Sequence, residues 1–168
     1  MNAYFAGGCF WCMEKPYHTI PGVRSAVSGY CGGSEENPKY EDVKAQKTHH
    51  RETVCVTFDE NAVTFETLLE VYLQSIDPFD AGGQFIDRGH SYTCAVYYVS
   101  DAQKKAAEKA LAALAQKANR SPAVAVEPFT VFWPAEEYHQ RYAEKHPEAY
   151  AEEYELSGRK AFREQRDE

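Results

Sequence analysis

Short apolar segments alternate along this chain with segments whose apolar residues recur at helical spacing. The apolar segments predict five strands, at residues 2–6, 22–29, 51–59, 93–100 and 124–132. Three helices are expected between them, beginning at or just after Cys9, running over residues 65–76, and following Ser100 to about Asn119. This β-α-β-β-α-β-α-β order is that of a split βαβ unit with an added strand. We therefore expect an α/β fold in which a ferredoxin-like core forms a two-layer sandwich.

Capping and breaking residues mark the ends of the predicted helices. Pro16 is expected to end or kink the first helix, because its ring fixes φ and removes a backbone N–H donor. Thr64 is the expected N-cap of the second helix, and Ser100 with Gln103 forms a capping-box pattern before the third. Further helical turns are expected over residues 134–154, as C-terminal elements added to the core.

Length and charge bound the kind of protein that this sequence encodes. At 168 residues the chain is expected to form a single domain over residues 1–168, with 159–168 as a charged, loosely ordered tail. The formal net charge of −8 argues against nucleic acid and anionic membranes as partners, since both are negative. No apolar run reaches the roughly 18–20 residues that cross a bilayer, and the N-terminus lacks the pattern of a secretory signal. We expect a cytoplasmic location.

Two cysteines, Cys9 and Cys12, lie three residues apart where the first helix is expected to start. Such a pair fits three interpretations: small side chains that fill a turn, half of a zinc site completed by His49 and His50, or a redox centre. The chain has no second Cys-x-x-Cys motif and its adjacent histidines lack ligand spacing, so zinc and any other metal are disfavoured. A helix N-terminus stabilises a thiolate, so the position of Cys9 predicts a lowered pKa and a nucleophile.

The residues between the two cysteines are both large aromatic rings, Phe10 and Trp11. A general dithiol exchanger has to admit many protein disulfides, whereas two rings beside a thiolate would form an apolar pocket for a small group. A methyl group next to sulfur suits such a pocket. The alternative is that both rings pack in the core.

Six blocks of sequence follow one another at consistent spacing from Tyr4 to about Tyr142: "GGCFWCME", "VSGYCGG", "NPKYEDV", "THHRETVCVTFD", "IDPFDAGGQFIDRGHSY" and "PAEEYHQRY". Together they resemble the peptide methionine sulfoxide reductase A family. The resemblance implies an α/β roll with a mixed sheet, in agreement with the split βαβ order. It also implies reduction of methionine-S-sulfoxide, free or in proteins, to methionine, with thioredoxin as the reductant and no cofactor.

The resemblance also implies roles for individual residues. Cys9 would be the attacking thiolate and Glu52 the acid that protonates the departing oxygen. Tyr40, Asp87 and Tyr92 would position the sulfoxide oxygen, directly or through water. To serve as an acid near neutral pH, Glu52 needs burial or a like-charged neighbour such as Asp87 to raise its pKa.

A second thiol is needed to resolve the sulfenic acid that the attack leaves on Cys9. The last cysteine of the chain is Cys94, so the C-terminal resolving cysteine found in many relatives of this kind is excluded. Cys12 is one helical turn from Cys9, within the roughly 4.4–6.8 Å Cα separation of a disulfide. Cys31, expected in a mobile glycine-flanked loop, is the competing candidate, and direct reduction of the sulfenic acid by an external thiol is the remaining alternative. Cys55 and Cys94 fit strand patterns and are expected to be structural.

Two functions from other classes remain alternatives at this point. A thioredoxin-like dithiol oxidoreductase would exchange the Cys9–Cys12 pair with protein disulfides and would need no sulfoxide. A zinc-dependent interaction module would bind metal stoichiometrically and lose its fold with a chelator.

Overall fold

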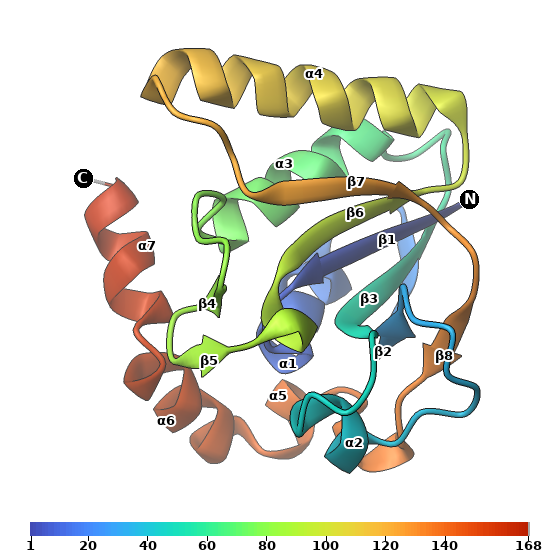
Figure 1. The fold of residues 1–168 in the computed structure, drawn as a ribbon, viewed down its shortest axis with the longest axis vertical. Helices are drawn as coiled ribbons and strands as arrows, with labels where there is room; N and C mark the ends of the chain where they lie inside the picture. The colour runs from blue at the N-terminus through green and yellow to red at the C-terminus, as the bar shows by residue number, and fades with distance from the viewer. Residues whose placement is uncertain (168) are drawn as a thin grey trace.

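The computed structural model describes residues 1–167, which form a mixed sheet of six strands covered by helices (Figure 1). The strand order is β7-β6-β1-β3-β2-β8, in which β6 and β7 are parallel and all other neighbours are antiparallel. The strands are β1 (Asn2–Gly7), β2 (Val23–Cys31), β3 (Arg51–Phe58), β6 (Cys94–Tyr98), β7 (Val124–Pro128) and β8 (Phe132–Pro134). A separate hairpin consists of β4 (Gly83–Gln84) and β5 (Asp87–Arg88).

Seven α-helices and three short 3₁₀ helices are distributed over the described residues. The α-helices are α1 (Phe10–Glu14), α2 (Tyr40–Lys44), α3 (Phe65–Ser75), α4 (Asp101–Ala118), α5 (Tyr142–Lys145), α6 (Pro147–Leu156) and α7 (Arg159–Asp167). The 3₁₀ helices are Lys15–Thr19, His90–Tyr92 and Glu137–His139. The mixed α/β class expected from the sequence is confirmed.

The predicted helix ends are confirmed. The Thr64 side chain accepts a hydrogen bond from the Thr67 N–H and caps α3, and the Ser100 side chain accepts one from the Gln103 N–H and caps α4. Pro16 lies in the first turn of the 3₁₀ helix that follows directly on α1, so the α-helix ends before it.

The single strand expected over 124–132 is wrong, because the chain forms two strands on opposite edges of the sheet. After β7 the chain leaves β6, crosses one face of the sheet, and pairs again as β8 with β2. The crossing is stabilised by rings: Phe129 stacks on Tyr4 with centroids 4.1 Å apart, and Phe132 packs on Tyr4 at 5.6 Å. Burial of these rings therefore outweighs continuation of the strand.

Side chains alternate between the two faces of the sheet and form two buried clusters. Along β1, Ala3 and Phe5 face the large cluster beneath α1, α3 and α4, whereas Tyr4 and Ala6 face a smaller cluster on the other side. The smaller cluster is covered by the segment between β7 and β8, and it includes Cys31. Cys31 thus lies on the sheet face opposite to α1.

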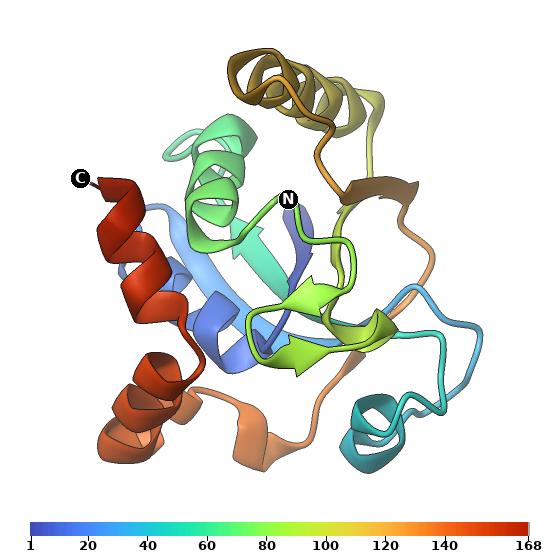
Figure 2. The same cartoon turned by 60° about the vertical axis from the view of Figure 1, so that its left-hand side comes forward.

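The loosely ordered tail expected from residue 159 is wrong: the chain forms α7 there, which packs against α6 (Figure 2). The Arg159 side chain is only 3% exposed. Its Nη2 donates to the Gly7 carbonyl at 2.7 Å and its Nη1 to the Ser75 carbonyl at 3.0 Å. Ser75 ends α3, where the helix dipole favours a cation. Residue 168, also part of the expected tail, lies outside the described residues.

Replacing Arg159 should therefore destabilise the protein strongly. In Arg159→Ala the two carbonyls lose a charged donor inside the protein, so we expect unfolding free energy to fall by about 2–4 kcal/mol. Lys160→Ala, which removes an equal charge from an exposed neighbour, should stay within about 0.5 kcal/mol of wild type. Urea denaturation measures both, and equal effects of the two changes would contradict this role.

Candidate active site

Cys9 lies in the tight connection between β1 and α1. Gly8 allows this connection, because its φ of +86° is one that residues with side chains rarely adopt. A Cβ at Gly8 would also lie 2.6 Å from Arg159 Nη2 and 2.7 Å from Gln84 Cβ. Cys9 is the N-cap of α1, and its carbonyl accepts the Cys12 N–H at 3.1 Å. The predicted start of the helix at Cys9 is confirmed.

Glu52 lies in β3 with only 2% of its surface exposed. Its Oε1 accepts a hydrogen bond from the Phe10 N–H at 3.2 Å. Its Oε2 has no hydrogen-bond partner within the described residues. Burial raises the Glu52 pKa to about 8; the Phe10 N–H opposes the rise and the charge of Asp87 adds to it. Glu52 therefore keeps its proton near neutral pH, which a general acid has to do.

Tyr40, Asp87 and Tyr92 come from three different elements and surround the same carboxyl group. Burial raises the pKa of Tyr40, and the charges of Glu52 and Cys9 raise it further. The pKa of Tyr92 is raised by burial, then by the charge of Glu52. Burial likewise raises the pKa of Asp87. These interactions indicate that the five predicted polar residues are grouped at one site: Cys9, Tyr40, Glu52, Asp87 and Tyr92.

Phe10 and Trp11 have different surroundings. Phe10 is 1% exposed and its ring lies 5.1 Å from that of His139 and 6.1 Å from that of Tyr40. Trp11 is half-buried: its ring stacks on Tyr142 at 3.8 Å, and its Nε1 donates to His139 Nδ1 at 3.1 Å. Trp11 is thus the more accessible of the two rings, and Phe10 packs in the core behind it.

The thiols of Cys9 and Cys12 shift each other's pKa in opposite directions. The hydrogen bond from Cys9 to Cys12 raises the pKa of Cys9 and lowers that of Cys12, which Arg159 and the Tyr150 hydroxyl lower further. The lowered Cys9 pKa expected from the helix start is therefore wrong for the reduced protein. The physical reason is that the Cys12 thiol and burial outweigh any effect of the helix N-terminus on this thiol.

Cys31 does not lie in a mobile loop, contrary to the expectation. It ends β2, fully buried, and pairs with Arg51 of β3 and Phe132 of β8. Burial raises the pKa of its thiol to about 12. Cys55 and Cys94 are buried within β3 and β6.

Several residues around the site were not singled out by sequence reasoning. Glu14 is 2% exposed and accepts hydrogen bonds from Ser28 Oγ at 2.6 Å and the Arg141 N–H at 2.8 Å, so it joins α1 to β2 and to the C-terminal segment. Arg159 and Tyr150 adjoin Cys12. Glu14 does lie in the first matching block, but no local pattern marks Arg159 or Tyr150, because their partners are distant in sequence.

Residues 1–167 do not provide a set of ligands for the zinc site considered above. In this part of the chain no three His, Cys, Asp or Glu side chains are grouped to hold a metal ion. His49 instead contacts Glu35 at 2.7 Å, and His50 Nδ1 accepts the Gly33 N–H at 3.1 Å. None of the helices in the same described residues has the length and hydropathy of a membrane span.

Comparison with known proteins identifies the family. The model of the peptide methionine sulfoxide reductase family matches residues 1–168. The chain belongs to this family. A peptide methionine sulfoxide reductase MsrA from Bacillus licheniformis is 48% identical over 165 residues, covering 97% of this chain and 91% of that protein. The reductase is therefore an oxidoreductase that acts on methionine sulfoxide.

Solved structures of the family share the fold of this reductase. Mxr1 from Saccharomyces cerevisiae in reduced form matches with a TM-score of 0.82 and 28% identity, over 88% of this chain and 86% of that one. Methionine sulfoxide reductase A of Corynebacterium diphtheriae matches with a TM-score of 0.79 and 28% identity, over 87% of this chain and 74% of that one. The family resemblance drawn from the six blocks is confirmed.

Proposed function

We propose that the reductase acts on methionine-S-sulfoxide, free or in proteins, by attack of Cys9 with acid catalysis by Glu52. The observation that carries this assignment is a buried carboxyl, protonated at neutral pH, that adjoins a redox cysteine. A sulfoxide oxygen leaves poorly without a proton, so the reaction requires this combination.

In the first step the Cys9 sulfur attacks the sulfoxide while Glu52 protonates the oxygen. Methionine leaves, the oxygen stays on Cys9 as a sulfenic acid, and the proton of the Cys9 thiol restores that of Glu52. Tyr40, Asp87 and Tyr92, which interact electrostatically with this carboxyl group or with one another, orient the oxygen. Trp11 forms the wall against which the methyl group packs, and Phe10 supports that wall from the core.

In the second step the Cys12 thiol condenses with the sulfenic acid of Cys9, which forms a disulfide and releases water. Two observations support Cys12. Its thiol interacts with that of Cys9, and this interaction lowers the pKa of Cys12, which favours a thiolate there. Cys31 faces the opposite side of the sheet with a raised pKa.

Thioredoxin is the reductant that we assign to the disulfide. The yeast relative Mxr1 has been solved in complex with Trx2, which supports this assignment by family membership. A cytoplasmic location accords with an odd number of cysteines.

We also infer a ferredoxin-like split βαβ core: β1 and β2 flank β3, β6 lies beside β1, and all these neighbours are antiparallel.

A turnover assay on the separate S and R epimers of methionine sulfoxide tests this function. With dithiothreitol as reductant, we expect oxidation of the thiol only in the presence of the S epimer, since each enzyme of this kind handles one epimer. Equal rates on both epimers would contradict the assignment. Oxidation of dithiothreitol driven by insulin-type disulfides alone would favour the dithiol oxidoreductase instead.

A further inference from the structure

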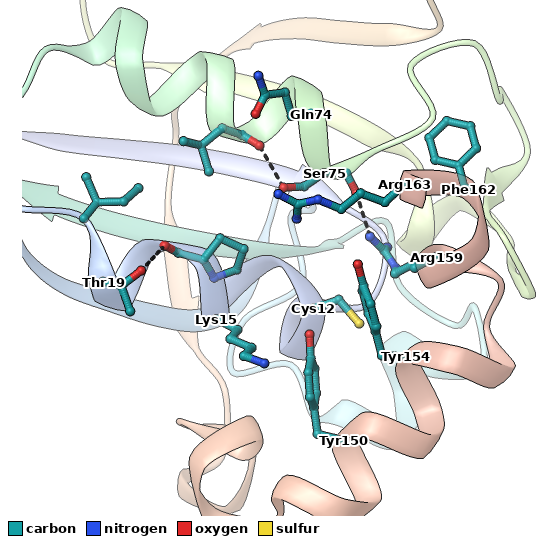
Figure 3. A pocket seen from close by; sticks show the side chains of 13 residues that line it. Cys12, Lys15, Thr19, Gln74, Ser75, Tyr150, Tyr154, Arg159, Phe162 and Arg163 are labelled. Carbon is teal, nitrogen blue, oxygen red and sulfur yellow. Dashed lines mark hydrogen bonds between the residues drawn. The ribbon is translucent and has the colours of Figure 1, made fainter. Parts of the chain in front are cut away.

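A cavity of about 470 Å³ opens beside Cys12 (Figure 3). Glu52 is not among the residues that line it. Its lining comes from α1, the 3₁₀ helix after it, α3, α6 and α7. Cys12 lies on its wall, together with Tyr150 and Tyr154, whereas Cys9 does not line it. We refer to this space as the Cys12 cavity.

The charges around the Cys12 cavity are all positive. Lys15, Arg159 and Arg163 line it, and no acidic side chain of the described residues does, although the chain has a net charge of −8. Lys15 Nζ lies 4.8 Å from the centroid of the Tyr150 ring, at the edge of the cavity. Arg159 is buried, and its Nε has no hydrogen-bond partner among the described residues. This lining favours a small anion.

The cavity gives access to Cys12, whereas Cys9 is not among the residues that line it. Figure 3 shows the Cys12 sulfur directed toward Tyr150 and Tyr154. Cys9 has Glu52 among its neighbours, whereas Cys12 interacts with the Tyr150 hydroxyl. In thiol–disulfide exchange the rate depends on which sulfur can be reached and on the stability of the departing thiolate. Cys12 is the sulfur that a molecule in this cavity can reach.

We propose that the Cys12 cavity binds a small anionic thiol that reduces the Cys9–Cys12 disulfide; this rests on the resolving role given to Cys12 above. The thiolate attacks the Cys12 sulfur, the Cys9–Cys12 bond breaks, and its electron pair leaves on Cys9, which then takes a proton. A second thiolate attacks the small molecule's sulfur in the mixed disulfide and releases Cys12 as a thiolate with a small disulfide. Arg159 and the Tyr150 hydroxyl stabilise that thiolate. Thioredoxin is too large for this space, so the cavity serves a second class of reductant.

Three thiols of similar size and different charge test the proposal: 3-mercaptopropionate, 2-mercaptoethanol and cysteamine. The wild-type protein is first oxidised with one equivalent of methionine sulfoxide, and its reduction is then followed by stopped-flow fluorescence at equal thiolate concentrations. We expect the anionic thiol to react about fivefold faster than the neutral one, and cysteamine to react most slowly. Salt should reduce the advantage.

A double variant and a matched control separate the cavity from the overall charge. In Lys15→Gln with Arg163→Gln, both exposed residues, the ratio of the anionic to the neutral rate constant should fall close to one. Lys105→Gln with Lys117→Gln removes the same charge from α4, away from the cavity, and should keep the ratio of wild type. Equal ratios in the two double variants, or no anionic preference in wild type, would overturn the proposal.

Different results would contradict the resolving role of Cys12 and the role of the Cys12 cavity. A peptide map of the oxidised protein that shows no Cys9–Cys12 disulfide contradicts the resolving role of Cys12 before any small thiol is added. A Cys9–Cys12 disulfide that is reduced without regard to charge leaves that role intact and contradicts the cavity's assignment alone.

Discussion

Cys9→Ser is expected to abolish reduction of methionine sulfoxide, with a loss on the order of 10⁴-fold or more, because a serine hydroxyl cannot take up the oxygen as a sulfenic acid. The measurement is methionine released in a single turnover, so recycling of the thiols does not enter. Cys31→Ala is the control: this cysteine lies on the other side of the sheet, and the folded fraction of the variant should release methionine at close to the wild-type rate. Release by Cys9→Ser at a rate near that of the control would contradict the role of Cys9.

Glu52→Ala should lower the single-turnover rate by about 10²–10⁴-fold, the usual effect of removing a positioned acid. Glu52→Gln should fall between this variant and wild type, since an amide donates a hydrogen bond to the oxygen without giving up a proton. Glu60→Ala, an exposed carboxyl in a turn, is the control. A rate within threefold of wild type for Glu52→Ala would contradict acid catalysis by this residue.

The pH dependence of the same rate adds a second readout for Glu52. Its raised pKa keeps the carboxyl protonated below about pH 8 and lets it ionise above that value. The rate of methionine release should therefore fall as the pH rises through about 8. Higher pH also increases the thiolate fraction, so the comparison is with Glu52→Gln, in which the fall should be absent.

The sequence was sufficient to predict those parts of the fold that depend on local pattern. Thr64 and Ser100 cap helices that begin where their apolar periodicity begins, and the first four predicted strands are found with every end within two residues of the expected one. Cys9 at the start of a helix was predictable as well, because Gly8 before it permits the turn. In each case the determining contacts lie within a few residues along the chain.

The errors arise where distant contacts decide the outcome. Arg159 is held by hydrogen bonds to the carbonyls of Gly7 and Ser75, which are more than 80 residues away in the sequence. The sequence around Arg159 therefore predicts only a charged tail. Cys31 is fixed in a strand by pairing with Phe132 rather than released by the glycines after it. The pKa of Cys9 depends on the Cys12 thiol and also on burial beside Glu52 of β3. No local pattern carries that information.

In the proposed mechanism Cys9 attacks the sulfoxide and Cys12 then condenses with the sulfenic acid formed on Cys9. Mass spectrometry of peptides from wild-type protein, oxidised by one equivalent of methionine sulfoxide without reductant, tests it most directly. We predict a disulfide between Cys9 and Cys12 with Cys31 as a free thiol. A disulfide between Cys9 and Cys31 with Cys12 free, or oxidation that leaves Cys9 as a thiol, would contradict the account.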